Sequence, residues 1–198
     1  MGRRHGALDP LSGMRRAVFL DRDGVLNRAF VHEGRPLPPA TLGEFEILPE
    51  AAPALRGLRA AGLLLIVATN QPDVARGQQR REVVEAMHRR LREALPLDDI
   101  KVCYEVEGPG TDCFKPKPGM LLAAAREHGI DLARSYMVGD RWRDVGAGKA
   151  AGCFTIFIDR GYREPLGETP DAICGDLGEA AAVILRSLDH RPQGGTAP

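Results

Sequence analysis

The stretch Ala17-Val18-Phe19-Leu20-Asp21-Arg22-Asp23-Gly24 decides the fold of this chain. Its first four residues form a short continuous apolar run, which is typical of a strand buried on both faces of a parallel sheet. Two aspartates follow this run, and Gly24 permits a sharp turn that would bring both carboxylates into the same crevice. We therefore expect a buried strand that delivers Asp21 and Asp23 to one edge of a sheet.

Apolar runs and amphipathic stretches alternate along the rest of the chain. Further strands are predicted at residues 63–68, 100–104, 136–139 and 154–158. Helices are predicted at residues 50–61, 81–95, 119–128, 144–151 and 177–188. Because strand–helix–strand units with right-handed crossovers build parallel sheets covered on both faces, the pattern predicts an α/β fold. We expect a Rossmann-like three-layer sandwich around a central parallel sheet.

The chain of 198 residues is predicted to fold as a single domain over residues 15–188. Residues 1–14 and 189–198 lack an apolar period and are expected to form a flexible leader and a flexible tail. Residues 28–45 follow the first strand and carry His32 and Arg35 among several prolines. This segment is too short for a separate cap domain, so we expect a minimal cap loop whose charged residues are solvated.

The composition argues against two classes of partner. The 27 Lys and Arg balance the 27 Asp and Glu, and this zero net charge argues against nucleic acid. No apolar run is long enough to cross a bilayer, and no signal-type apolar core follows the basic N-terminus. We therefore expect a cytoplasmic protein with no membrane partner. A monomer is expected as well, because the helical faces are needed to cover the sheet.

Polar residues gather where the predicted strands end, or in the loop before the helix at 119–128. In parallel sheets of this kind the ligand lies beyond the carboxyl ends of the strands. The candidate site residues are Asp21, Asp23, Thr69, Asn70, Lys115, Asp140, Arg141 and Asp144. We expect them to form one constellation.

Several carboxylates without a histidine or cysteine beside them favour a hard cation, and Mg²⁺ is the usual one. The metal and Lys115 would offset the charge of phosphoryl oxygens, while Thr69 and Asn70 would donate hydrogen bonds to them. One aspartate could then attack phosphorus and form an aspartyl phosphate. A second could protonate the leaving oxygen and later accept a proton from water. The residues thus predict a Mg²⁺-dependent phosphomonoesterase.

Four segments resemble the four motifs of the haloacid dehalogenase (HAD) superfamily. They are FLDRDGVLN at 19–27, VATNQ at 67–71, KPKPGM at 115–120 and VGDRWRD at 138–144. More narrowly, they resemble its small, nearly capless branch, which includes D-glycero-D-manno-heptose 1,7-bisphosphate 7-phosphatase and the histidinol-phosphate phosphatases. The resemblance covers residues 17–188.

The resemblance implies a role for each of the first candidate residues. Asp21 would be the nucleophile and Asp23 the general acid and base. Thr69 and Asn70 would bind the phosphoryl group. Lys115 would neutralise the nucleophile and the phosphate.

The resemblance also implies a metal set. Asp140 would ligate Mg²⁺ together with Asp21 and the main-chain oxygen of Asp23. Asp144 would act on the metal through water. Arg141 would touch the substrate, a small phosphorylated metabolite.

The loop before Lys115 departs from the pattern of that branch, whose members carry a structural zinc on a Cys-x-His pair and a later Cys-x-Cys pair. Cys103 and Cys113 remain here, but Glu105 and Thr111 stand where a histidine and a cysteine would be. A closed zinc site needs four nitrogen or sulfur ligands, so we expect an ordered loop without zinc. The four cysteines are too few for a disulfide framework, and we expect reduced thiols.

Phe114 is a second departure, because the heptose bisphosphatases have an arginine there that could hold the second phosphate. Arg141, Arg143 or Lys117 would then have to supply this cation. A heptose bisphosphate is the expected substrate, and histidinol phosphate is the alternative.

Two alternatives of another class remain. Phospho-accepting signalling domains also combine carboxylates, a threonine and a lysine on a parallel sheet, but by resemblance they lack a counterpart of Asp23. The second alternative is an inactive relative of such enzymes that serves as a partner subunit, although every expected catalytic residue is present.

Overall fold

A six-stranded parallel sheet forms the centre of the protein, whose computed structural model describes residues 14–190. The strand order is β5-β4-β1-β6-β7-β8, and each neighbouring pair is parallel. The strands are β1 (Ala17–Leu20), β4 (Leu64–Asn70), β5 (Asp99–Cys103), β6 (Tyr136–Gly139), β7 (Phe154–Ile158) and β8 (Ala172–Cys174). This sheet confirms the predicted Rossmann-like α/β fold.

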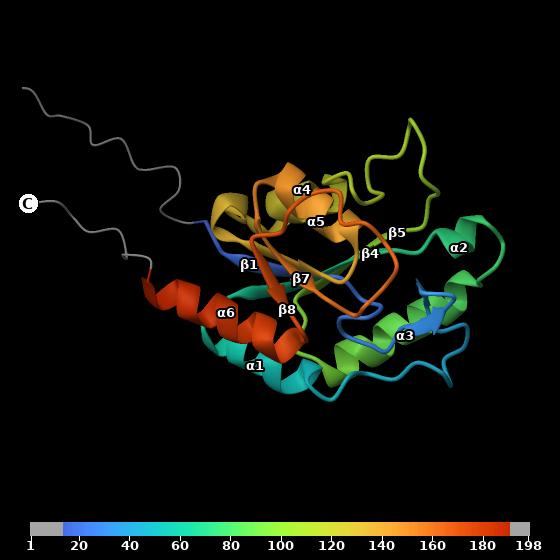
Figure 1. Cartoon of the computed structure of the whole chain (residues 1–198), viewed down its shortest axis with the longest axis horizontal. Coiled ribbons are helices and arrows are strands. Elements are labelled where there is room, and N and C mark those ends of the chain that lie inside the picture. The colour runs from blue at the N-terminus through green and yellow to red at the C-terminus, as the bar shows by residue number, and fades with distance from the viewer. Residues whose placement is uncertain (1–13, 191–198) are drawn as a thin grey trace, which may run out of the picture.

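Helices cover both faces of the sheet (Figure 1). One face packs against α1 (Ala51–Ala60), α3 (Arg81–Ala94) and α6 (Leu177–His190). The other packs against α4 (Gly119–His128) and is flanked by α5 (Trp142–Ala151). Every side chain of β1 is fully buried, and Val18 and Phe19 belong to the cores on opposite faces. The apolar run at the start of the domain is therefore the two-sided central strand that it predicts.

Several elements differ from the expected ones at their ends. β4 extends through Asn70, so that Thr69 and Asn70 are the last residues of the strand and do not follow it. α6 ends at His190, two residues beyond its expected end. The short α2 (Pro72–Ala75), a 3-10 turn (Leu132–Arg134) and β8 had no counterpart in the prediction. Apart from Met14 and residues 189–190, the expected leader and tail lie outside the described residues.

The cap loop contains a two-stranded antiparallel hairpin of β2 (Phe30–His32) and β3 (Arg35–Leu37). Its tip, Glu33-Gly34, has positive φ values of 51° and 80°, as two-residue hairpin turns require. His32 and Arg35 are exposed on it. Among residues 14–190, no helix combines the length and the apolar character needed to cross a membrane.

Candidate active site

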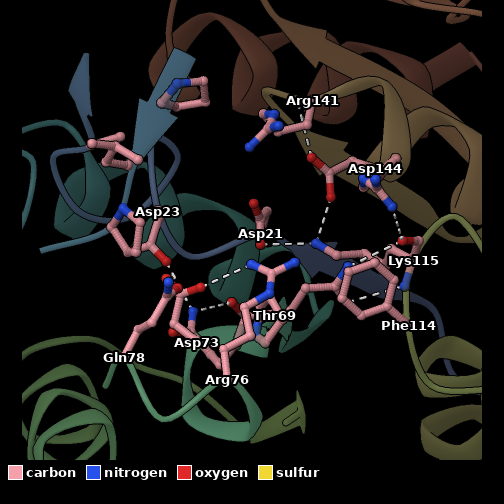
Figure 2. Close-up of a pocket in the computed structure, with 18 residues that line it drawn as sticks. Asp21, Asp23, Thr69, Asp73, Arg76, Gln78, Phe114, Lys115, Arg141 and Asp144 are labelled. Carbon is pink, nitrogen blue, oxygen red and sulfur yellow. Dashed lines mark hydrogen bonds and ion pairs between the residues drawn. The ribbon is translucent and has the colours of Figure 1, made fainter. Parts of the chain in front are cut away.

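An ammonium group joins two carboxylates at the carboxyl edge of the sheet. Asp21 follows β1 directly, and Asp144 lies in the first turn of α5. Lys115, from the loop between β5 and α4, donates from Nζ to Oδ1 of Asp21 at 2.8 Å and also to Oδ1 of Asp144. All three residues are buried, and Figure 2 shows the Lys115 side chain reaching both carboxylates. Three segments far apart in the sequence therefore meet at one point.

Asp140 completes a cluster of three buried carboxylates. One oxygen from each of Asp21, Asp140 and Asp144 lies within 4.8 Å of the others. Oδ2 of Asp140 accepts a hydrogen bond from the Tyr162 hydroxyl at 2.8 Å, whereas Oδ1 is buried and has no partner among the described residues. A buried carboxylate oxygen without a donor is costly unless a cation meets it. Three carboxylates beside a single ammonium form an all-oxygen donor set that fits Mg²⁺.

The crowding of these charges shifts their titration. Burial and then the Asp144 charge raise the pKa of Asp21 to about 6, although Lys115 opposes the shift. Burial and the charges of Asp21 and Asp144 raise the pKa of Asp140 well above its ordinary value. Burial acts to lower the pKa of Lys115, but the two carboxylates beside it hold the pKa above its usual range. The ammonium therefore stays charged, and a further cation would relieve the remaining repulsion.

The Asp23 carboxylate is held through both of its oxygens. Arg22 donates to both, at 2.9–3.2 Å. Nδ2 of Asn27 donates to Oδ1 at 2.9 Å, and Nε2 of Gln71 donates to Oδ2 at 3.0 Å. Burial acts to raise the pKa of Asp23, but the charge of Arg22 and these hydrogen bonds outweigh it and leave the pKa below its ordinary value. The sequence prediction named Asp23 and missed the three side chains that bind it, although all three lie inside the quoted motifs.

Thr69 and Asn70 line the pocket beside Asp21, but their present partners differ. Oγ1 of Thr69 accepts a hydrogen bond from Nε2 of Gln71 at 2.9 Å, which leaves the hydroxyl hydrogen for an anion. The Asn70 amide donates to the main-chain oxygen of Lys115 at 3.1 Å and accepts from its main-chain nitrogen at 3.0 Å. Asn70 therefore fixes the loop that carries Lys115, a function that the sequence did not indicate.

Two glycines allow the carboxylates to approach the backbone. Gly24 has a φ of +87°, and a Cβ there would lie 1.8 Å from Oδ2 of Asp140. A Cβ on Gly139 would lie 2.1 Å from Cβ of Asp144. No side chain other than hydrogen fits at either position without moving a carboxylate.

A pocket of about 400 Å³ opens over these residues (Figure 2). Seven of the eight candidate residues line it; Asp140 is the exception. The cap hairpin contributes Pro36 and Leu37, and Phe114 and three arginines, Arg76, Arg141 and Arg143, also line the pocket. The lining therefore combines buried carboxylates with several cationic side chains.

Each of these three arginines has an acidic partner, and Nη1 of Arg76 donates to Oδ1 of Asp73 at 3.0 Å. Nε of Arg141 donates to Glu164 at 2.6 Å, and a second contact joins the same two side chains. Arg143 donates to Glu107 at 2.8 Å, and its guanidinium lies over the rings of Phe114 and Trp142, at 5.2 Å and 4.6 Å from their centroids. Phe114 thus packs as a platform for a cation instead of supplying one.

The cysteine prediction is wrong for one pair: Cys103 and Cys113 form a disulfide, with their Cα atoms 5.5 Å apart. Cys103 ends β5, and the loop that follows returns to the same point just before Phe114, so the two sulfurs meet although ten positions separate the cysteines in the sequence. Cys153 and Cys174 are free and buried, in line with the expected reduced thiols. Sulfurs bonded to each other offer a metal no thiolate.

Comparison with known proteins shows that this chain is similar to phosphatases. Residues 39–152 match the haloacid dehalogenase-like hydrolases. The chain is 35% identical over 202 residues to a D-glycero-D-manno-heptose-1,7-bisphosphate 7-phosphatase of Thermosynechococcus vestitus, covering 89% of this chain and 99% of that one. It is 36% identical over 191 residues to the D-glycero-beta-D-manno-heptose-1,7-bisphosphate 7-phosphatase of Escherichia coli K12, covering 89% and 92%.

A solved structure gives the same comparison in three dimensions. The D,D-heptose 1,7-bisphosphate phosphatase of B. bronchiseptica, in complex with magnesium and phosphate, superimposes with a TM-score of 0.73 at 31% identity. The match covers 87% of this chain and 99% of that one. Most of this chain therefore has the same fold as nearly the whole of that enzyme.

Proposed function

The chain belongs to the haloacid dehalogenase-like hydrolase family and is a phosphoric monoester hydrolase, and from this premise we propose that it is a Mg²⁺-dependent heptose bisphosphate phosphatase. One observation carries the mechanism: Lys115 binds Asp21 inside a cluster of three buried carboxylates. The heptose names of the relatives support the substrate class. A signalling domain is not favoured, because Asp23 is present and the relatives are phosphatases.

Asp21, Asp140 and the main-chain oxygen of Asp23 would hold Mg²⁺. When bound, the metal would offset negative charge on the phosphoryl oxygens. Lys115 would bind the same group from the other side, with the Thr69 hydroxyl and the Asn70 amide as donors. Asp144 contacts Lys115 directly, so we assign it the positioning of the ammonium in addition to a water-mediated contact with the metal.

The carboxylate of Asp21 would attack phosphorus and displace the sugar oxygen, which takes a proton from Asp23. Asp23 would then remove a proton from water, and the resulting nucleophile would hydrolyse the aspartyl phosphate and free Asp21. Because its pKa is lowered by Arg22, Asp23 must gain its proton in the substrate complex. The phosphate supplies the reason, since its negative charge opposes that of Arg22 and favours the neutral carboxyl.

The second phosphate would be bound by Arg143. Its partner Glu107 is an exposed side chain, so a phosphate can replace that carboxylate at small cost. Arg141 is held more firmly, since Glu164 is only 20% exposed in its side chain. Phe114 lacks the charge of the arginine expected there but holds the Arg143 guanidinium in place. We propose a cytoplasmic enzyme, because the substrate class is a small metabolite, and a monomer, because the apolar faces of the helices cover the sheet.

The test is turnover of a panel of phosphate esters with and without Mg²⁺. Heptose 1,7-bisphosphate, a heptose monophosphate and histidinol phosphate separate the substrate alternatives. Arg143→Ala should raise KM for the bisphosphate and leave KM for the monophosphate unchanged. Activity without Mg²⁺, or activity that survives Asp21→Asn, would refute the mechanism.

A further inference from the structure

A buried histidine lies behind the acid–base carboxylate. His88, on α3, is 3% exposed, and its Nε2 lies 3.1 Å from Nη1 of Arg22. Arg22 is fully buried and uses its other two nitrogens, Nε and Nη2, to bind Asp23. A guanidinium carries donors only, so Nε2 of His88 must be the acceptor. One guanidinium therefore joins the histidine to the carboxylate.

The surroundings of His88 keep it in the form that can accept this bond. Burial and then the Arg22 charge lower the pKa of His88 to about 4, although Glu85 opposes the shift. The other ring nitrogen, Nδ1, lies 3.7 Å from Oε2 of Glu85, and Glu85 in turn accepts a hydrogen bond from the Tyr104 hydroxyl. The ring is thus neutral at neutral pH, with its hydrogen on Nδ1 and its lone pair toward Arg22.

Packing alone does not account for a histidine here. The other buried residues of α3 are Val84, Met87 and Leu91, all apolar. A buried imidazole costs free energy unless it is hydrogen-bonded, so an apolar residue would serve the core better. The bond to Arg22 is the gain that distinguishes His88 from its neighbours.

We propose that His88 is a positioning residue: by holding Arg22, it keeps the Asp23 carboxyl where a proton can pass to the leaving oxygen. This inference rests on the proposed function, in which Asp23 is the acid. Without His88 the guanidinium loses one of its anchors, and Asp23 loses its fixed orientation. Attack by Asp21 on phosphorus does not use this chain of contacts. The defect should therefore follow the need of the leaving group for a proton.

The experiment compares the single-turnover rate of phosphoryl transfer to Asp21 from heptose 1,7-bisphosphate with the rate from p-nitrophenyl phosphate, whose leaving group needs little protonation. The later hydrolysis of the aspartyl phosphate also uses Asp23 and is common to both substrates, so it is left out of the comparison. Asp23→Asn sets the scale and should lower the ratio of the two rates about a hundredfold. His88→Ala should lower the same ratio by about tenfold, part of that general-acid effect. His88→Gln, whose side-chain oxygen can accept from Arg22, should restore the ratio to within about threefold of wild type. Val84→Ala, a truncation on the same buried face, should leave the ratio unchanged.

Two results would overturn the proposal: an equal loss on both substrates in His88→Ala, or a glutamine variant no better than the alanine variant. A second measurement needs no variant. Nitrogen NMR of the wild-type imidazole should show a neutral ring protonated on Nδ1 at neutral pH, and a charged ring or a hydrogen on Nε2 would refute the contact. Failure of the proposed function would differ, since the wild type would then not turn over heptose 1,7-bisphosphate while the NMR result still stood.

Discussion

Nζ of Lys115 lies 2.8 Å from Oδ1 of Asp21, although 94 positions separate the two residues in the sequence. The contact fixes the nucleophile and places a positive charge where a phosphoryl group would arrive. Asn70 stabilises the same arrangement from the backbone side, since its amide makes two hydrogen bonds to the main chain of Lys115. The protein's own contacts thus hold the ammonium and the nucleophile together, which is what electrostatic stabilisation of a transition state requires.

Replacement of this ammonium gives the first prediction. Lys115→Met should lower kcat by at least about a hundredfold, the scale expected when one charge-stabilising donor is lost. It should also reduce the free energy of unfolding by about 3 kcal/mol without Mg²⁺, because two buried carboxylates lose their counter-charge. Phosphatase assays and urea unfolding measure the two effects.

Lys117→Met is the matched control for that experiment. Lys117 lies two residues away and donates to main-chain oxygens of Gly108 and Thr111, outside the carboxylate cluster. Near-normal activity is expected for this variant on a substrate with one phosphate. Equal losses in the two variants would argue that the loop, and not the ammonium, matters.

Gly24→Ala should damage the site through Asp140. The added Cβ would lie 1.8 Å from Oδ2 of Asp140, so this carboxylate must move. We expect Mg²⁺ affinity, measured by titration calorimetry, to fall at least about tenfold, as when a metal ligand loses its orientation. Gly129→Ala controls for backbone strain, since its φ is also positive, at +64°, and a Cβ there meets nothing within 4 Å. Unchanged Mg²⁺ binding in Gly24→Ala would exclude Asp140 as a ligand.

Local signals explain which parts of the fold were predictable. The strand β1 is predictable because its four residues are all apolar. The end of α4 is predictable because Gly129, with a left-handed φ of 64°, directly follows the helix. The candidate site followed from topology, because parallel strands bring their carboxyl ends to one edge. That argument needs no knowledge of distances between side chains.

The missed features depend on contacts without a period in sequence. β8 is a three-residue strand with Ile173 62% exposed, and it is too short to give a recognisable apolar pattern. Tyr162 and Glu164 reach the site from an irregular loop, and only the tertiary fold places them beside Asp140 and Arg141. His88 could have been noticed in the sequence, because it is a polar residue on the otherwise apolar face of its helix.

The lowered pKa of His88 predicts how the stability of the protein depends on pH. Its pKa is lowered from 6.5 to about 4 in the folded protein by burial and Arg22, so the unfolded chain binds the extra proton between these values. Stability should therefore decline as pH falls from about 6.5 toward about 4 and be fully present at higher pH. At pH 5 the loss from this residue is about 2 kcal/mol.

Urea unfolding of wild type and His88→Gln at pH 7 and pH 5 isolates this contribution, because the other titrating groups are common to both proteins. The glutamine variant should lose less stability on acidification than wild type. Identical pH dependence in the two proteins would show that His88 is not held neutral by the fold.

The cysteines give the last prediction, and it bears on the compartment. Protein quenched in acid directly from cells, denatured and alkylated without reductant, should carry two labels, on Cys153 and Cys174, and a cross-linked peptide that joins Cys103 to Cys113. With reductant, four labels are expected. In the native protein Cys153 should resist alkylation at neutral pH, because burial raises its pKa to about 12 and the thiolate is the reactive form. Four labels without reductant would contradict the disulfide and return two thiolates to the loop before Lys115, where a metal could then compete for them. Two labels would support the disulfide, and a protein with the proposed cytoplasmic location would then be an exception to the rule that cytosolic thiols stay reduced.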